Sequence, residues 1–287
     1  MFTAALFLVA LASSPESTAS QIPPAIYTDP VQDTANPARM EVLHIPSGDV
    51  HINGVAYLAA GAGPHPTIII CHGLPGNEKN LDLAQALRRA GWNAITFNYR
   101  GSWGSPGSFR FAQNPEDARA VLAYLRVAEN AHRLGVDTSH LVLAGHSMGG
   151  WVSAMASFND DWIRGTILIS SGNLGKRFEI PRAELVARMA DNMESLVGTT
   201  AEAMAEELNA NAAAFDYTRG AAGLVNKPLL VLSSDDGLAP QSDALVAAVN
   251  KAGGKQVTAI HVATDHSWSD RRIRLQSKIL NWLAKLK

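Results

Sequence analysis

The residues Gly145–Gly149 form a G-x-S-x-G pattern with Ser147 at its centre. The pattern follows the apolar run Leu141–Ala144 and precedes an alanine-rich segment, which predicts a strand, a tight turn and a helix in this order. In this setting the glycines let strand and helix approach without Cβ clashes, and the turn exposes the serine hydroxyl. Ser147 is therefore a candidate nucleophile. The alternative is a turn serine with a purely structural role.

An acid and a base that could activate a serine follow two later apolar runs. Asp235 and Asp236 come after Pro228–Ser233, and His266 comes after Val257–Val262. A serine hydroxyl needs a general base, and the base needs an acid that orients it. Because the carboxyl ends of parallel strands meet at one edge of a sheet, we expect these side chains to lie beside the serine.

Other histidines compete with His266 for the role of base. His261 lies inside a predicted strand rather than after it, whereas His72 and His146 directly precede a glycine and the candidate serine. Histidines in such positions usually hold loops through hydrogen bonds to the backbone, so His266 is preferred. Asp265, its neighbour, is expected to be solvated or to cap a turn.

A glycine-rich turn after an early strand could stabilise a developing oxyanion. The β-branched run Thr67–Cys71 is followed by His72–Gly76. Such a turn can direct a backbone N–H at the oxyanion, and the residue after the nucleophile supplies the second donor. We assign these donors to Leu74 and Met148. Cys71, at the end of the strand, is interpreted as a small buried apolar residue.

Taken together, the motifs resemble those of the alpha/beta-hydrolase superfamily, over nearly all of the chain from about Met40. Each motif alone is moderately specific, but their order and spacing fit one domain. The resemblance lies in an H-G-x-P-G oxyanion loop (His72–Gly76), a loop after the fourth strand (Asn98–Ser105), the nucleophile elbow (Gly145–Gly150) and an acid loop (Asp236–Pro240).

The resemblance implies an α/β fold: an eight-stranded, mostly parallel sheet with helices on both faces and a helical cap insertion after strand six. It implies a serine hydrolase with Ser147 as nucleophile, His266 as base and an acid that orients the base. Asp236 is favoured over Asp235 as that acid, because the family often has an aspartate four residues before a proline and Pro240 fits this spacing.

Two residues depart from the family pattern. Asn98 stands where many relatives have aspartate, which we interpret as structural, and Trp103 stands where glycine is common. Trp103 could line the substrate pocket or could pack on the loop surface. Trp103, His72 and His146 are our candidate substrate-contacting residues, with a loop-holding role as the alternative for the histidines. Arg100 is interpreted as tying loops together.

Length and composition fit one folded globular domain. The chain has 287 residues, of which 47% are hydrophobic and 17% charged, with a net charge of −2 and one cysteine. This charge gives no electrostatic basis for nucleic-acid binding, and a single cysteine excludes an intrachain disulfide. No C-x-x-C or H-E-x-x-H spacing indicates a metal site, and we expect no cofactor and no stable membrane partner. The oligomeric state is left open.

The remaining pattern alternates short apolar runs with amphipathic segments, as expected for a sheet covered on both faces. The first two strands flank a turn and form a predicted antiparallel hairpin. The predicted strands are 41–45, 51–58, 67–71, 94–98, 141–144, 165–170, 228–233 and 257–262, and predicted helices include 80–90, 115–134 and 270–286.

The segment 172–226 is longer than an ordinary connection and is the predicted cap. Two or three helices are expected in it, roughly Pro181–Leu196 and Thr200–Phe215. Its apolar side chains could line an acyl or side-chain pocket, but attachment of the cap to the core is the preferred explanation for any single one of them. These side chains are Met189, Met193, Met204 and Phe215.

The N-terminus carries an apolar run, Phe2–Ala12, too short to span a bilayer and followed by small residues. It predicts a signal peptide over residues 1–19 and export to the periplasm or the medium, with a cytoplasmic location as the alternative. Residues 20–39 are expected to be a linker or a surface arm, and residues 40–287 the hydrolase domain.

The predicted function is cleavage of a carboxylic ester through an acyl-enzyme, with a small ester as the substrate. The alternative is a serine peptidase acting on short peptides, which would need a carboxylate for the substrate amine. Glu179, Glu184 and Glu194 are candidates for it. A non-catalytic binding protein on the same fold is a third, weaker hypothesis, because fold alone does not fix function.

Overall fold

The computed structural model describes residues 22–286, so the predicted signal peptide lies outside the described residues and export stays a prediction. The described arm before the first strand contains a short helix, η1 (Pro24–Ile26), whose Ala25 and Ile26 pack against the core. The guanidinium of Arg89 donates to the Ala25 carbonyl over 2.6 Å. Within the described part of the chain, no helix combines the length and the apolar character that crossing a membrane requires.

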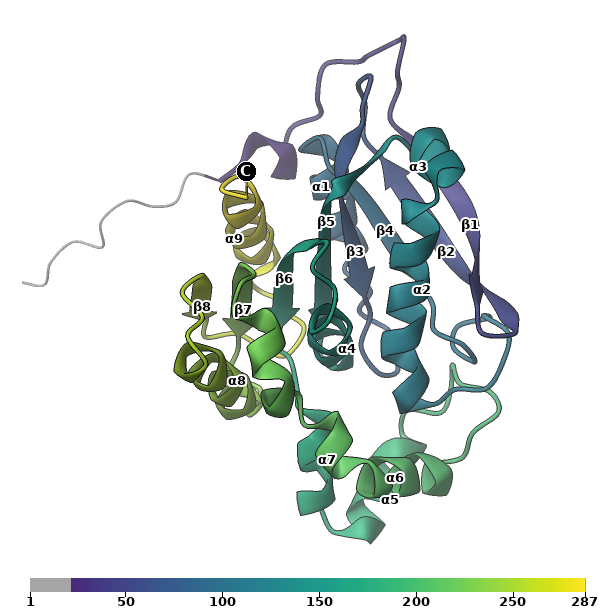
Figure 1. Cartoon of the computed structure of the whole chain (residues 1–287), viewed down its shortest axis with the longest axis vertical. Coiled ribbons are helices and arrows are strands. Elements are labelled where there is room, and N and C mark those ends of the chain that lie inside the picture. Colours follow the sequence, from purple (N-terminus) through teal and green to yellow (C-terminus); the bar gives the residue numbers. More distant parts are fainter. Residues whose placement is uncertain (1–21, 287) are drawn as a thin grey trace, which may run out of the picture.

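One eight-stranded sheet forms the centre of the molecule (Figure 1). Its strand order is β1-β2-β4-β3-β5-β6-β7-β8; β2 is antiparallel to β1 and to β4, and the other pairs are parallel. This confirms the predicted eight-stranded, mostly parallel α/β fold. The strands are β1 (Arg39–Ser47), β2 (Val50–Leu58), β3 (His65–Cys71), β4 (Asn93–Phe97), β5 (Val136–His146), β6 (Ile163–Ile169), β7 (Leu229–Ser233) and β8 (Val257–His261).

Helices cover both faces of this sheet because its central strands are apolar on both sides. In β3, Ile68 and Ile70 belong to the core cluster that includes α1 and α9, whereas Ile69 belongs to the cluster on the opposite face, which includes α2 and α4. The helices are α1 (Leu81–Arg89), α2 (Asn114–Arg126), α3 (Ala128–Leu134), α4 (Met148–Ser157), α8 (Ala239–Lys251) and α9 (Arg272–Leu283).

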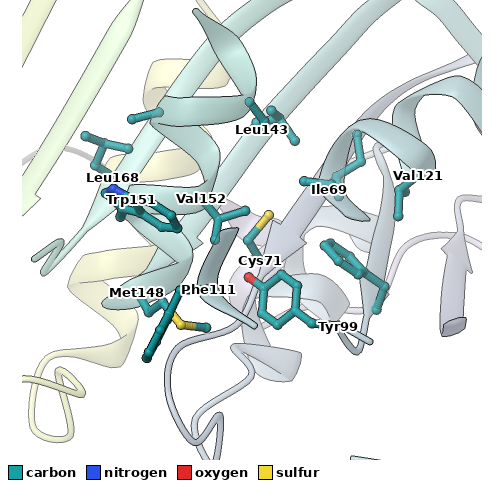
Figure 2. Packing of buried hydrophobic residues seen from close by; sticks show 14 of the residues in the cluster. Ile69, Cys71, Tyr99, Phe111, Val121, Leu143, Met148, Trp151, Val152 and Leu168 are labelled. Carbon is teal, nitrogen blue, oxygen red and sulfur yellow. The ribbon is translucent and has the colours of Figure 1, made fainter. Parts of the chain in front are cut away.

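Figure 2 shows the core between the sheet and α2 and α4. Ile69 and Leu143 of the sheet face the same buried layer as Val121 of α2 and Val152 of α4. Fully burying an aliphatic side chain of this size contributes about 1.5–3 kcal/mol. Cys71 lies in this layer and is completely buried, and burial raises the pKa of its thiol to about 12. The thiol is therefore uncharged, in line with its interpretation as a small apolar residue.

Several elements differ from their predicted extents. The single helix predicted over 115–134 is two helices, because Val127 has an extended backbone (φ −63°, ψ 123°) that ends α2 and begins α3. Strand β5 extends well beyond the predicted 141–144. Segment 172–226 contains shorter helices than predicted: η3 (Leu174–Glu179), α5 (Arg182–Ala190), α6 (Ala201–Ala210), α7 (Ala212–Phe215) and η4 (Tyr217–Leu224).

We call residues 172–226 the insertion. Its helices α5, α6 and α7 lie at the lower end of the molecule in Figure 1, beyond the carboxyl ends of the parallel strands. The insertion is tied to the loop after β4, since the N–H of Trp103 donates to the Ser195 carbonyl and that of Val197 to the Gly101 carbonyl, both over 2.9 Å. That the insertion acts as a cap over the active site stays a prediction.

A buried ion pair fixes the loop after β4. Arg100 Nε donates to Asp117 Oδ1 over 2.6 Å, and the Arg100 backbone N–H donates to Asp117 Oδ2 over 2.9 Å. Ser47 at the end of β1 also donates to Asp117, whose side chain is 0% exposed. Burial raises the pKa of Asp117, although Ser47 and Arg100 oppose the rise. Arg100 thus ties loops together, as interpreted from the sequence.

Replacing Asp117 by alanine should lower the free energy of unfolding by about 3–5 kcal/mol, because it leaves the Arg100 cation buried without its main partner. Urea unfolding followed by circular dichroism measures the change. Glu116→Ala is the matched control: Glu116 also pairs with Arg100 but is 61% exposed, so about 1 kcal/mol or less is expected. Equal losses in both variants would contradict the role of the buried pair.

Candidate active site

Ser147 lies on the turn between β5 and α4. Its backbone has φ 58° and ψ −122°, a left-handed conformation that strains a residue with a Cβ by about 1–3 kcal/mol. The Ser147 N–H donates to the Ile169 carbonyl at the end of β6 over 2.9 Å, and the Ser147 carbonyl accepts from the Gly150 N–H. The sheet and the first turn of α4 thus hold the strained residue, as the predicted strand, turn and helix require.

The glycines around Ser147 are required by close backbone contacts. A Cβ on Gly145 would lie 1.9 Å from the Gly149 carbonyl oxygen, and a Cβ on Gly149 would lie 2.0 Å from the Cys71 carbonyl oxygen. No side chain fits at either distance, and the neighbouring atoms belong to backbone that cannot move aside. The G-x-S-x-G pattern therefore reflects the crossing of α4 over β5 and β3.

The two assigned oxyanion donors lie in the same pocket as Ser147. Met148 is the first residue of α4, and neither its N–H nor that of Leu74 has a backbone acceptor among residues 22–286. A helix N-terminus also favours negative charge. The oxyanion loop lies against the elbow, since a Cβ on Gly73 would be 3.1 Å from Ser147 Cβ.

His72 stiffens the oxyanion loop from inside. Its Nδ1 donates to the Gly73 carbonyl over 2.8 Å, and its own carbonyl accepts from the Tyr99 hydroxyl over 3.0 Å. A Cβ on Gly76 would collide with the ring, which explains the glycine there. Burial lowers the pKa of His72 to about 4, so its imidazole is neutral at neutral pH. These contacts correspond to the loop-holding alternative; a substrate contact by His72 stays a prediction.

The structure separates the adjacent aspartates. Asp236 Oδ2 accepts from His266 Nδ1 over 2.6 Å, whereas Asp235 Oδ1 contacts His261 Nε2 at 2.9 Å. The Asp236 side chain is 5% exposed and that of Asp235 is 61% exposed. Of the two, only Asp236 offers a buried carboxylate, and its partner His266 lies at the edge of the sheet where Ser147 lies. Asp265 instead accepts from the Ser269 N–H and caps a turn.

Two opposing effects act on the pKa of Asp236. Burial alone would raise it, but hydrogen bonds from His266 and from the Leu238 N–H outweigh burial and hold the pKa below its usual range. The carboxylate is therefore ionised at neutral pH. Because a carboxylate can only accept, the His266 proton resides on Nδ1, and Nε2 is left with a free electron pair.

His146 connects the turn that carries Ser147 to the loop that carries His266, residues 262–271, which we call the base loop. Its Nε2 donates to the His266 backbone carbonyl over 2.8 Å, and the two rings lie 4.6 Å apart. The structure records no direct hydrogen bond between the Ser147 and His266 side chains within residues 22–286, so His146 is what joins the two segments. Burial, with His266 as a lesser cause, lowers the pKa of His146 to about 4.

A buried tryptophan that sequence reasoning missed anchors the base loop. Trp268 is completely buried, has φ 59° and donates from Nε1 to Ser170 Oγ over 2.9 Å. Ser170 in turn shares a 2.7 Å hydrogen bond with Ser234, just before the aspartates. In the sequence, the only sign of this contact is a tryptophan two residues after the candidate base. Its position alone does not reveal that its partner is Ser170.

A pocket of about 280 Å³ surrounds Ser147 and extends into the insertion. Of the four apolar candidates in the insertion, Met189 lines it, whereas Met204 and Phe215 are buried in the core. Glu179 and Glu184 are not among its lining residues and instead pair with Lys176 and Arg188. The pocket is lined by Leu74, Phe111, Ser147, Met148, Gly172, Leu174, Arg177, Arg188, Met189, Asp191, Asn192 and Leu208.

Trp103 joins the oxyanion loop to its neighbours. Its indole N–H donates to the Pro75 carbonyl over 2.5 Å, and the Lys79 ammonium lies 4.2 Å from the centre of its ring. Its carbonyl accepts from the side-chain amide of Asn98, consistent with a structural role for that residue. The pocket around Ser147 is lined by other residues, and a substrate contact by Trp103 stays a prediction.

The chain belongs to the alpha/beta hydrolase family, whose model matches residues 68–275. Family membership supports a hydrolytic activity. Two curated relatives are uncharacterized proteins from two strains of Mycobacterium tuberculosis, each 26% identical over 125 residues. The match covers 43% of this chain and only 43% of the length of those relatives.

Solved structures share the fold at low sequence identity. An esterase of Pyrobaculum calidifontis aligns with a TM-score of 0.66 and 20% identity, over 87% of this chain and 86% of its own. The carboxylesterase EstE1, cloned from a metagenomic library, gives 0.65 and 20%, over 88% and 91%. The acylaminoacyl peptidase of Pyrococcus horikoshii gives 0.65 and 16%, over 86% of this chain but only 41% of its own.

The neutral His146 makes stability depend on pH. Its pKa is about 4 in the folded chain and about 6.5 when unfolded, so the unfolded chain binds the extra proton between these values. The resulting stabilisation, about 3 kcal/mol at most, is complete above pH 6.5 and is lost as pH falls towards 4. We expect a smaller loss in His146→Gln. An NMR titration showing His146 protonated near pH 6.5 in the folded chain would contradict this.

Proposed function

We propose that this chain cleaves carboxylic esters through an acyl-enzyme formed on Ser147. The observation that carries the proposal is the sheltered hydrogen bond between Asp236 and His266. The base loop, which carries His266, is held by His146, and His146 directly precedes Ser147 on the strained turn. An ionised acid, a base with a free Nε2 and a serine on a turn are the three parts that serine acyl transfer requires.

In the proposed first step, Ser147 Oγ attacks the ester carbonyl carbon while His266 Nε2 takes the hydroxyl proton. The electron pair of the carbonyl moves onto its oxygen, where the N–H groups of Leu74 and Met148 stabilise the charge. Asp236 stabilises the imidazolium without taking the proton. The tetrahedral intermediate then collapses, the bond to the alkoxide breaks, and His266 returns the proton to the leaving alcohol.

In the second step a water molecule replaces the alcohol. His266 takes a proton from the water as its oxygen attacks the acyl carbon, and the same two N–H groups hold the second oxyanion. The bond to Ser147 Oγ breaks, Oγ recovers the proton from His266, and the carboxylic acid leaves. No other group is needed to balance the reaction.

A serine peptidase is the second candidate function. Asp191 is an exposed carboxylate among the residues that line the Ser147 pocket, and it could bind the ammonium of a short peptide. The acylaminoacyl peptidase of Pyrococcus horikoshii shares the fold, which shows that the fold accommodates amide cleavage. Esters are preferred because Asp191 lies at an exposed position, and an ester needs no such anchor.

The first test is turnover of 4-nitrophenyl esters of increasing acyl length and of aminoacyl 4-nitroanilides. We expect ester hydrolysis that falls by about 10⁴-fold or more in Ser147→Ala, because the nucleophile is lost. Anilide turnover above ester turnover would favour the peptidase. Absence of both activities, or activity that survives in Ser147→Ala, would overturn the mechanism and favour a binding protein.

The adjacent aspartates offer a matched pair of variants. Asp236→Asn should lower kcat by about 10⁴-fold, because an amide can donate to His266 Nδ1 and so favours the wrong tautomer. Asp235→Asn should stay within about threefold of the parent, since its carboxylate faces His261 at an exposed site. Ester kinetics at pH 8 measure both. Comparable losses in the two variants would remove the assignment of Asp236 as the orienting acid.

A further inference from the structure

Arg177 is an unpaired cation in the pocket of the candidate nucleophile. It belongs to η3 of the insertion and lines the same cavity as Ser147. Within residues 22–286, its guanidinium has no hydrogen-bond acceptor and no ion-pair partner. Burial lowers the pKa of Arg177, and the nearby Arg188 cation lowers it further. Arginine nonetheless stays charged, so the pocket contains an uncompensated positive charge.

Every other partly buried arginine in residues 22–286 has a polar partner: Arg88, Arg89 and Arg110 donate to uncharged side-chain or backbone oxygens, and the remaining three contact carboxylates. Arg100 is paired with Asp117, Arg126 binds both carboxylate oxygens of Asp160 over 2.7 and 2.9 Å, and Arg272 contacts Asp82. A charge withdrawn from water without a partner is costly, because attraction to an opposite charge normally offsets the lost hydration. Arg177 is thus an exception in this chain, and an anionic ligand would supply the partner that it lacks.

The other two charged side chains that line the pocket are either paired or exposed. Arg188 is held by Glu184 of the same helix, with N and O 2.6 Å apart. Asp191 is exposed and forms no ion pair with Arg177 within the described residues. One guanidinium is therefore left free, which matches a single carboxylate better than a doubly charged group that Asp191 would also repel.

The backbone that carries Arg177 is firmly held. Asn173, just before η3, donates from its backbone N–H to Gln241 Oε1 over 2.6 Å and from its side chain to Asp216 Oδ1 over 2.7 Å. Gly172 leaves room for the guanidinium, because a Cβ at that position would lie 3.3 Å from Arg177 Nη2. Gly172 itself lines the pocket, so the guanidinium lies beside the space open to substrate.

We propose that Arg177 binds a carboxylate of the substrate, so that the preferred esters carry an acid group on the part that enters the insertion. This inference rests on the proposed ester hydrolysis and names its substrate class. A guanidinium matches a carboxylate through two parallel N–H···O hydrogen bonds. The apolar side chains of Leu174, Met189 and Leu208 would contact the methylene groups between the ester and the acid.

The test compares mono-4-nitrophenyl adipate with its neutral methyl ester, methyl 4-nitrophenyl adipate, which differ in charge at the distal end. The parent protein should prefer the acid by kcat/KM. In Arg177→Met, kcat/KM for the acid should fall about 10- to 100-fold more than for the neutral diester, mainly through KM. Arg177→Lys should restore part of the preference, because it restores the charge without the two-pronged geometry.

Arg182→Met is the matched control, since Arg182 is an exposed arginine at the start of α5 that does not line the pocket. It should keep the acid preference. Arg177→Met should unfold at an equal or higher urea concentration than the parent, because it removes an unpaired, partly buried charge. Equal losses for both substrates, or no acid preference in the parent, would overturn the inference while leaving ester hydrolysis intact.

A binding experiment separates this inference from the proposed reaction. Monomethyl adipate is titrated into Ser147→Ala and into the Ser147→Ala, Arg177→Met double variant, with chemical shifts recorded by NMR. Binding that is lost in the double variant supports the carboxylate site, even if neither ester is hydrolysed and the proposed function fails. Equal binding to both variants, or none to Ser147→Ala, would overturn it.

Discussion

The close crossing of α4 over β5 and β3 is the constraint on which the rest of the site depends. It leaves no space for a Cβ at Gly145 or Gly149, and it forces the residue between them into a strained backbone conformation. The sheet order places β3 directly beside β5, so the loop after β3 reaches the same turn. Backbone packing therefore brings the candidate nucleophile and the proposed oxyanion loop to one edge of the sheet before any side-chain chemistry is considered.

Two neutral imidazoles hold the loops at this edge: His146 joins the turn at Ser147 to the loop of His266, and His72 stiffens the oxyanion loop from inside. His72 and His146 are both buried with pKa values of about 4, and each donates one hydrogen bond to a backbone carbonyl. A second cation beside His266 would hinder its protonation, so an uncharged imidazole at position 146, 4.6 Å from the His266 ring, suits the site better than lysine or arginine would. The hydrogen-bonded Asp236–His266 pair is thus the acid and base proposed to serve Ser147.

The sequence predicted the fold well because buried parallel strands produce continuous apolar runs that alternate with amphipathic helices. The prediction of helix boundaries failed where tertiary contacts determine them. The break at Val127 and the short helices of the insertion have no clear periodic signal in the sequence. For the site, motif spacing indicated which residues gather at the sheet edge. It could not show that Asp235 turns to His261 or that Trp268 anchors the base loop, because partner choice depends on strand register and loop packing.

The molecule divides its tasks between two parts. The sheet edge contributes groups whose positions are fixed by backbone packing and suit any acyl transfer, whereas the insertion contributes Leu174, Arg177 and Met189 to the pocket. An unpaired guanidinium there does not help the fold, since burial of a lone charge is unfavourable. The substrate carboxylate proposed above would complete its electrostatics. Substrate choice should therefore reside in the insertion, and it should change with the insertion's charge while the acyl-transfer groups stay the same.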